Sequence, residues 1–164
     1  MVGSLSTGDE LRDPGDAAGA GDIYDANRPM LSALVAGWGY DVIDLGRAPD
    51  DRDRLRGMLD TAATQCDVIL SSGGASAGDE DHMSALLENT GSFALWRIAM
   101  KPGRPLALGL WKDTPVFGLP GNPVAAMVCA LVFATPALAV MAGGTWQAPI
   151  SYQLPAAFSK SKKA

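Results

Sequence analysis

The sequence lacks several features that would assign it to a function class directly. It has two cysteines in 164 residues, neither in a Cys-X-X-Cys motif, so neither a disulfide scaffold nor a zinc site is supported. Its single histidine, His82, would have to serve alone, which disfavours hydrolysis through a protein nucleophile. Basic side chains are few: 13 Lys and Arg stand against 18 Asp and Glu, and the net charge of −5 argues against a strongly basic nucleic-acid binder.

Long apolar segments are also absent. No unbroken apolar run approaches the roughly 18 residues of a membrane span, and residues 1–5 have neither the basic flank nor the apolar stretch of a signal peptide. We therefore expect a soluble, cytoplasmic protein that contacts neither a membrane nor nucleic acid. The 48% of hydrophobic residues suffice for one core. The pattern predicts one domain over residues 1–143 and a tail, residues 144–164, in which periodicity weakens.

Segments with strand and helix periodicity alternate along residues 1–143. Apolar runs predict strands at 2–5, 42–45, 67–70, 93–100, 106–110 and 115–119. Helices are predicted from an Asn27 N-cap to Gly39, from Asp51, from Asp81, and from an Asn122 N-cap to about Met141. Strands that alternate with helices predict an α/β fold, a three-layer sandwich around a mostly parallel sheet.

A glycine-rich segment, residues 71–78, follows the third predicted strand and precedes a helix. Backbone N–H groups in such a loop can bind an anion together with a helix N-terminus, but the same glycines also suit a plain tight turn, and the residue types favour neither interpretation. The segment is neither a Walker A motif nor a Gly-X-Gly-X-X-Gly fingerprint, which disfavours an ordinary NTPase or dehydrogenase. The candidate ligand-binding residues here are Ser72, Gly73, Gly74, Ser76 and Gly78.

A second loop, residues 118–123, follows another predicted strand. In a parallel sheet both loops open at the carboxyl edge, where ligands bind in open α/β folds. Two prolines restrict its backbone, although good capping of the next helix explains the same residues and is the favoured interpretation of this loop alone. Its candidate binding residues are Pro120, Gly121, Asn122 and Pro123.

Charged side chains gather in the predicted loops. Acidic residues cluster on three of them, and such oxygen ligands suit Mg²⁺, which would offset repulsion between the acids and a phosphate. Each acid taken alone is more often a helix cap or a solvated charge. Arg97, Lys101 and Arg104 surround a Pro-Gly turn and suit a phosphate or a small oxyanion, although a solvated loop end explains them equally well.

Three segments together resemble one family of enzymes. They are Ser72-Gly73-Gly74-Ala75-Ser76-Ala77-Gly78-Asp79-Glu80-Asp81, Lys101-Pro102-Gly103-Arg104-Pro105-Leu106-Ala107 and Gly118-Leu119-Pro120-Gly121-Asn122-Pro123-Val124. Segments 6–11, 23–28 and 44–51 add to the likeness, which spans about residues 2–141. In order and spacing, these motifs resemble the molybdopterin molybdotransferases of the MoeA type, a family shared with the E domain of gephyrin.

The resemblance implies a molybdopterin-binding α/β domain and a role in the last step of molybdenum cofactor synthesis. In that step adenylylated molybdopterin and molybdate give the cofactor and AMP, with Mg²⁺ assisting. By position, Glu10, Asp50 and Asp81 match active-site acids that would hold the metal, and Arg97 and Lys101 match a basic pair. The family is dimeric, so a second copy is an implied partner, and so is a molybdopterin adenylyltransferase.

Departures from the family pattern leave two alternatives open. The usual Gly-Gly-Val-Ser-Val-Gly loop is Gly-Gly-Ala-Ser-Ala-Gly here, and Arg97 stands where lysine is common. Family members also have further domains, so ligand binding without turnover is one expected outcome. The first alternative is a MogA-type adenylyltransferase of the same fold, whose Ser-Gly-Gly-Thr-Gly loop matches less well. The second is a non-catalytic scaffold module, because a fold does not determine a function.

Overall fold

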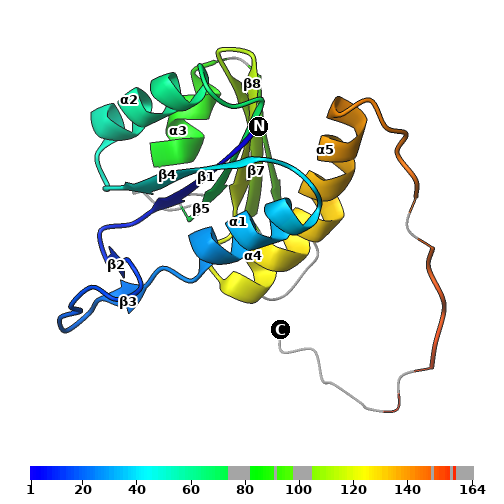
Figure 1. The fold of residues 1–164 in the computed structure, drawn as a ribbon, viewed down its shortest axis with the longest axis horizontal. Helices are drawn as coiled ribbons and strands as arrows, with labels where there is room; N and C mark the ends of the chain where they lie inside the picture. The colour runs from blue at the N-terminus through cyan, green and yellow to red at the C-terminus, as the bar shows by residue number, and fades with distance from the viewer. Residues whose placement is uncertain (74–81, 91, 98–104, 149, 156, 158–164) are drawn as a thin grey trace.

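The fold is built on one six-stranded sheet (Figure 1). The computed structural model describes the chain except for residues 74–81, 91, 98–104, 149, 156 and 158–164. The strand order is β4-β1-β5-β8-β7-β6. The strands are β1 (Val2–Thr7), β4 (Val42–Ala48), β5 (Val68–Ser72), β6 (Phe93–Arg97), β7 (Pro105–Trp111) and β8 (Thr114–Leu119). β4, β1, β5 and β8 are parallel and β7 is antiparallel to its neighbours, which confirms the predicted, mostly parallel sheet.

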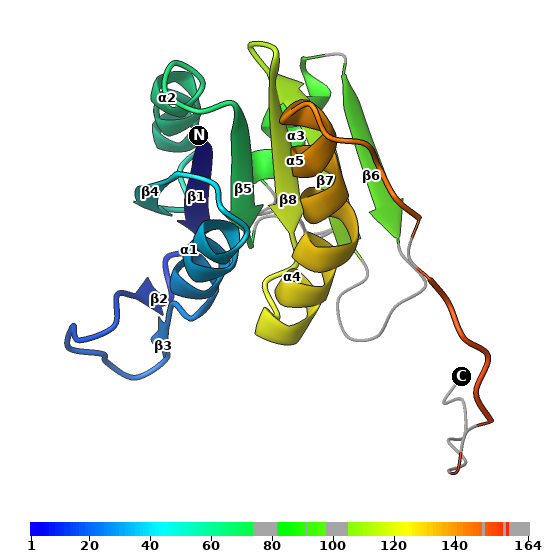
Figure 2. The same cartoon turned by 45° about the vertical axis from the view of Figure 1, so that its right-hand side comes forward.

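Helices cover both faces of the sheet and complete the predicted three-layer sandwich (Figure 2). On one face lie α1 (Asn27–Gly37), α4 (Pro123–Cys129) and α5 (Thr135–Met141), and on the other α2 (Arg52–Ala62) and α3 (His82–Glu88). Each interface has its own core: Leu70 and Leu119 are buried under α1 and α4, while Leu59 and Ile69 are buried on the α2 side. Ile69 and Leu70 point to opposite faces because side chains alternate along a strand.

One nearly continuous helix runs from Pro123 to Met141 through a π-helical segment, η1 (Ala130–Ala134). Pro136 has no N–H to continue the helical hydrogen bonds, and the Thr135 hydroxyl donates to the carbonyl of Ala130, five residues earlier, at 3.1 Å. By length and composition, with a mean hydropathy of 2.3, this is the one helix among the described residues that could cross a membrane. A core helix meets the same criterion, and the side of this helix that includes Leu138 packs into the core.

Several strand boundaries differ from the prediction. β1 and β5 run two residues past their predicted ends and β4 three, so Ser71 and Ser72 end a strand instead of beginning a loop. Ser72 pairs with Ser6 of β1 and with Leu119 of β8, so backbone pairing sets the end of β5. A short parallel ribbon, β2 (Leu11–Arg12) and β3 (Ile23–Tyr24), occupies a region predicted as loop. Residues 98–100 of the predicted strand 93–100 lie outside the described residues.

Two helices begin where they were predicted to begin, at Asp51 and at the predicted Asn122 N-cap, and each has a side-chain cap there. Asp51 Oδ1 accepts a hydrogen bond from Arg54 N at 2.9 Å at the start of α2. Asn122 Oδ1 accepts from Ala125 N at 3.2 Å at the start of α4. These side chains satisfy N–H groups that the first helical turn leaves without partners. The third predicted cap, Asp81, lies outside the described residues.

The predicted cap at Asn27 is wrong. Asn27 is the first residue of α1, and its side chain makes no capping hydrogen bond. Asp25 performs this role, because its Oδ1 accepts from both Asn27 N and Arg28 N at 3.1 Å. Both residue types are good caps, so the choice between them depends on the tertiary contacts of Asp25.

Candidate functional site

The carboxyl ends of five strands meet at one edge of the sheet. β4, β1, β5 and β8 are parallel, and β6 shares their direction because β7 is antiparallel to both β8 and β6. Ligands of open α/β folds bind at such an edge. The chain leaves the sheet here after Thr7, Ala48, Ser72, Arg97 and Leu119. We call the described segments that follow, residues 8–10, 49–51, 73 and 120–123, the carboxyl-edge loops.

Two carboxyl-edge loops lie close together at glycines. Gly73 has a φ of +81°, and a Cβ there would lie 2.7 Å from the carbonyl oxygen of Thr7, so only glycine fits without strain. Gly73 N donates to Leu119 O at 3.2 Å. A Cβ on Gly121 would lie 4.0 Å from Gly73 Cα. The start of the glycine-rich segment and the loop after β8 are therefore neighbours, as predicted from their places after parallel strands.

Two hydrogen bonds, each from a backbone N–H to a carboxylate, join the acidic loops after β1 and β4. Asp9 N donates to Asp50 Oδ2 at 3.1 Å, and Asp50 N donates to Asp9 Oδ1 at 3.2 Å. The Glu10 carboxylate folds back toward β1, since a Cβ on Gly8 would meet Glu10 Oε2 at 2.5 Å. Within the described residues, no group of three or more His, Cys, Asp or Glu side chains is arranged to hold a metal ion. The predicted third acid, Asp81, lies outside those residues.

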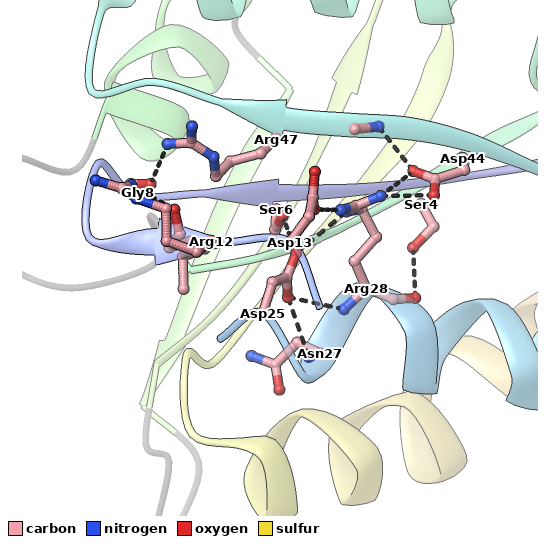
Figure 3. A network of polar contacts seen from close by, with 12 residues as sticks. Ser4, Ser6, Gly8, Arg12, Asp13, Asp25, Asn27, Arg28, Asp44 and Arg47 are labelled. Carbon is pink, nitrogen blue, oxygen red and sulfur yellow. Dashed lines mark hydrogen bonds and ion pairs between the residues drawn. The ribbon is translucent and has the colours of Figure 1, made fainter. Parts of the chain in front are cut away.

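Arg28 is buried, with 7% of its surface exposed, and lies among three carboxylates (Figure 3). Its Nε donates to Asp25 Oδ2 at 3.1 Å, its Nη1 donates to the two oxygens of Asp44 at 2.6 and 2.5 Å, and its Nη2 pairs with Asp13. Asp25 is 1% exposed and also accepts from Ser6 Oγ at 2.5 Å. The network therefore connects the start of α1 to β1, to β4 and to the segment between β2 and β3.

Arg28 and Asp44 keep each other ionised. Burial alone would lower the pKa of Arg28, but hydrogen bonds and charges from Asp44, Asp25 and Asp13 outweigh it and raise that pKa above its ordinary value. Partial burial would raise the pKa of Asp44, but hydrogen bonds from Arg28 and from Gly46 N hold that pKa below its ordinary value. A fixed ionic network therefore supports the helix that begins beside the carboxyl-edge loops.

Asn27 connects this network to the loop after β8. Its Nδ2 donates to the carbonyl oxygen of Gly121 at 2.8 Å, across a separation of 94 residues. Its Oδ1 is buried and has no hydrogen-bond partner in the part of the chain that the structure describes. The same holds for the hydroxyls of Ser71 and Ser72. The sequence did not predict Asn27 as a site residue, because an asparagine at the start of a helix is already explained as an N-cap.

The described members of the predicted site lie along this one edge. Glu10, Asp50, Gly73 and residues 120–123 belong to the carboxyl-edge loops, while Ser72 and Arg97 end the strands β5 and β6 there. The other predicted site residues lie outside the described residues: Gly74, Ser76, Gly78, Asp81 and Lys101. Asp25 and Arg28 were not predicted as site residues, although charged side chains at a helix start next to a strand-end loop are a usable signal.

One groove reaches this edge of the sheet. A groove of about 630 Å³ lies between β4 and α2, and its walls include Leu45, Arg47, Pro49, Arg54 and Met58. Pro49 is the residue that this groove shares with the carboxyl-edge loops. The candidate site is defined by its convergent loops and polar contacts.

Comparison with known proteins identifies the family. Residues 3–140 match the family described as "Probable molybdopterin binding domain". The chain is 40% identical over 149 residues to the molybdopterin molybdenumtransferase of Haemophilus influenzae, a match that covers 90% of this chain and 37% of that protein. A solved MoeA protein of molybdopterin biosynthesis from Pyrococcus horikoshii is 34% identical, with a TM-score of 0.76 over 87% of this chain and 35% of that chain.

A smaller solved protein shares the fold. The molybdopterin biosynthesis enzyme MoaB from Thermus thermophilus is 20% identical, with a TM-score of 0.62 over 89% of this chain and 98% of that chain. The present chain spans little more than a third of the MoeA-type relatives that it matches, at 37% and 35% of their lengths. The family match over residues 3–140 nevertheless includes all of the carboxyl-edge loops. The chain therefore belongs to the molybdopterin-binding domain family.

Proposed function

We propose that the chain binds molybdopterin, or its adenylylated form, at the carboxyl-edge loops and takes part in the transfer of molybdate to molybdopterin with release of AMP. The observation that carries the proposal is the hydrogen bond from Gly73 N to Leu119 O, which joins the start of the glycine-rich segment to the end of β8 in a chain of this family. It is supported by the 40% identity to a protein named as a molybdopterin molybdenumtransferase.

The residues of this chain suit positioning better than covalent catalysis. Burial raises the pKa of the thiols of Cys66 and Cys129, which makes both poor nucleophiles. The loops instead offer backbone N–H groups and the Ser72 hydroxyl at the end of β5, which would orient a phosphate-bearing ligand. Arg97 ends β6 at the same edge, and we assign it, with Lys101, to holding molybdate.

The acidic loops fit a hard cation such as Mg²⁺. Carboxylate oxygens are its preferred protein ligands, and Asp50 Oδ1 has no hydrogen-bond partner among the described residues. Glu10 and Asp50 would hold the ion, with Asp81 as the expected third ligand, while Asp9 fixes the loop of Asp50 through the paired backbone contacts. When bound, Mg²⁺ would neutralise charge on the phosphoanhydride of the adenylylated ligand.

Binding and turnover are separate parts of the proposal. The matched region is 37% of the Haemophilus influenzae relative, so we assign ligand binding to the matched residues and turnover to the whole enzyme. We propose two partners: a second copy of the chain, and an adenylyltransferase that supplies the adenylylated ligand. We place these proteins in the cytoplasm.

A calorimetric titration tests this function. The chain is titrated anaerobically with molybdopterin and with adenylylated molybdopterin in the presence of Mg²⁺, molybdate is then added, and released AMP is measured. Binding of either ligand supports the proposal, and AMP release extends it to turnover by this chain alone. A separate incubation of the chain with ATP and molybdopterin tests the adenylyltransferase alternative, which the formation of pyrophosphate would favour. If neither ligand binds, the proposed function is refuted.

A further inference from the structure

We infer that Asn27 is a positioning residue for the ligand site. Its Nδ2 donates a hydrogen bond to the Gly121 carbonyl, and this bond holds the loop after β8 in its binding shape. The inference rests on the proposed function and adds to it a residue that lies on α1, outside the predicted binding loops. Asn27 is 8% exposed and reaches the loop across 94 residues of sequence. A contact of this kind sets the relative placement of two elements that the sequence order does not bring together.

The geometry determines which end of the amide faces the loop. The carbonyl oxygen of Gly121 can only accept, so Nδ2 must point toward it and Oδ1 away from it, as observed at 2.8 Å. The backbone N–H of Asn27 donates to Asp25, whose carboxylate is held in turn by Ser6 Oγ and by Arg28 Nε. The donor that holds the loop therefore stands on a rigid base (Figure 3).

The loop that Asn27 holds is also the one that meets the glycine-rich segment. Gly121 has no side chain of its own to anchor it, and a Cβ there would be 4.0 Å from Gly73 Cα. A shift of the Gly121 peptide would therefore change the gap between the two binding loops. The buried Oδ1 of Asn27, which has no hydrogen-bond partner among the described residues, also supports a positioning role. A buried amide with one unsatisfied end costs free energy, so stability alone does not explain an asparagine at this position.

The decisive variant is Asn27→Asp, which keeps the size of the side chain and replaces the donor with an oxygen. At about pH 8 an anionic carboxylate would face the Gly121 carbonyl, and we expect the dissociation constant for molybdopterin to rise about tenfold or more. Burial and the neighbouring Asp25 carboxylate disfavour the charged form of the introduced carboxyl, so lowering the pH to about 5 should protonate part of it, restore a donor and recover part of the affinity relative to wild type. Each affinity is measured by calorimetry against wild type at the same pH, because the phosphate of the ligand also titrates.

Ser6→Ala is the matched control. It removes a buried hydrogen bond to the same Asp25 carboxylate at the same helix start, but Ser6 makes no side-chain hydrogen bond to the Gly121 loop among the described residues. Its unfolding midpoint in urea should fall while its molybdopterin affinity stays within about twofold of wild type. Asn27→Ala adds no charge and should lose affinity equally at both pH values, so the test stands even if Asn27→Asp fails to fold.

The outcomes separate this inference from the proposed function. If wild type does not bind molybdopterin, the proposed function itself fails. If wild type binds and folded Asn27→Asp and Asn27→Ala bind equally well, the role of Asn27 is refuted while the proposed function stands. If Ser6→Ala weakens binding as much as Asn27→Ala does, the effect comes from the helix start in general, and the specific role of Asn27 is likewise refuted.

Discussion

Replacement of Asp25 by alanine is expected to remove a large part of the stability of this fold. The Asp25 carboxylate is 1% exposed and accepts hydrogen bonds from Ser6 Oγ, from the N–H groups of Asn27 and Arg28, and from Arg28 Nε. Arg28 keeps Asp44 and Asp13 as partners, so the cost comes from the buried donors that lose their acceptor, at about 1–3 kcal/mol for an unsatisfied group, and from the lost helix cap, at about 1 kcal/mol. One carboxylate performs both roles, so the costs overlap, and we expect a loss of about 3–5 kcal/mol in the free energy of unfolding.

The matched control is Asp13→Asn, which removes a different partner of the same guanidinium. The Asp13 side chain is 53% exposed, against 1% for that of Asp25. Exposed ion pairs contribute only about 0–1 kcal/mol because water and salt screen them. The comparison therefore contrasts a buried and an exposed carboxylate partner of the same arginine.

Urea unfolding measures both variants. A domain of this kind has a total stability of about 5–15 kcal/mol, so Asp25→Ala should lower the midpoint by about a fifth or more with little change in slope. Asp13→Asn should leave the midpoint nearly unchanged. If Asp25→Ala costs less than about 1 kcal/mol, or no more than Asp13→Asn, the assignment of Asp25 as the buried anchor of α1 is refuted.

Two further predictions follow from the same contacts. Gly73→Ala should lower the free energy of unfolding by about 1–3 kcal/mol, because φ is +81° and the new Cβ would lie 2.7 Å from Thr7 O. Gly121→Ala should cost far less, because among the described residues beyond its chain neighbours its Cβ would meet no atom closer than 4.0 Å. Equal urea midpoints for the two variants would contradict this prediction. The pKa of Asp44 is lowered in the folded state, so its contribution to stability is present above the unfolded pKa and is lost as the pH falls through the folded pKa, below about 4. Asp44→Asn should therefore make the free energy of unfolding fall less steeply as the pH is lowered. An unchanged acid side of the plot of stability against pH would show that Asp44 is not the source of this pH dependence.

Local signals in the sequence predicted most of the fold. The continuous apolar run before Ser71 identifies a strand buried on both faces, a helix begins at Asp51 as predicted, and Asn122 caps the helix that it was predicted to cap. Strand-then-helix order also predicted that the glycine-rich segment and the loop after β8 would open at one edge, which the parallel pairing of β5 with β8 and the hydrogen bond from Gly73 N to Leu119 O confirm.

The features that escaped prediction depend on contacts between distant residues. Asp25 and Asn27 are both good capping residues, and Asp25 takes the role because Ser6 and Arg28 hold its carboxylate. The extension of β5 through Ser72 likewise comes from pairing with its neighbours in the sheet, which no local pattern records. The Asn27 contact with the loop after β8 spans 94 residues, so periodicity could not have indicated it.

The central claim is that molybdopterin binds at the carboxyl-edge loops, and glycine amide resonances test it most directly. Isotope-labelled chain is titrated with molybdopterin, and the N–H signals of Gly8, Gly73 and Gly121 are followed beside those of Gly57, which lines the groove between β4 and α2, and Gly143, which follows α5. The account predicts that the first three signals shift with a common dissociation constant while the last two stay in place. Shifts confined to Gly57 or Gly143, or no shift at any concentration of ligand, would contradict it.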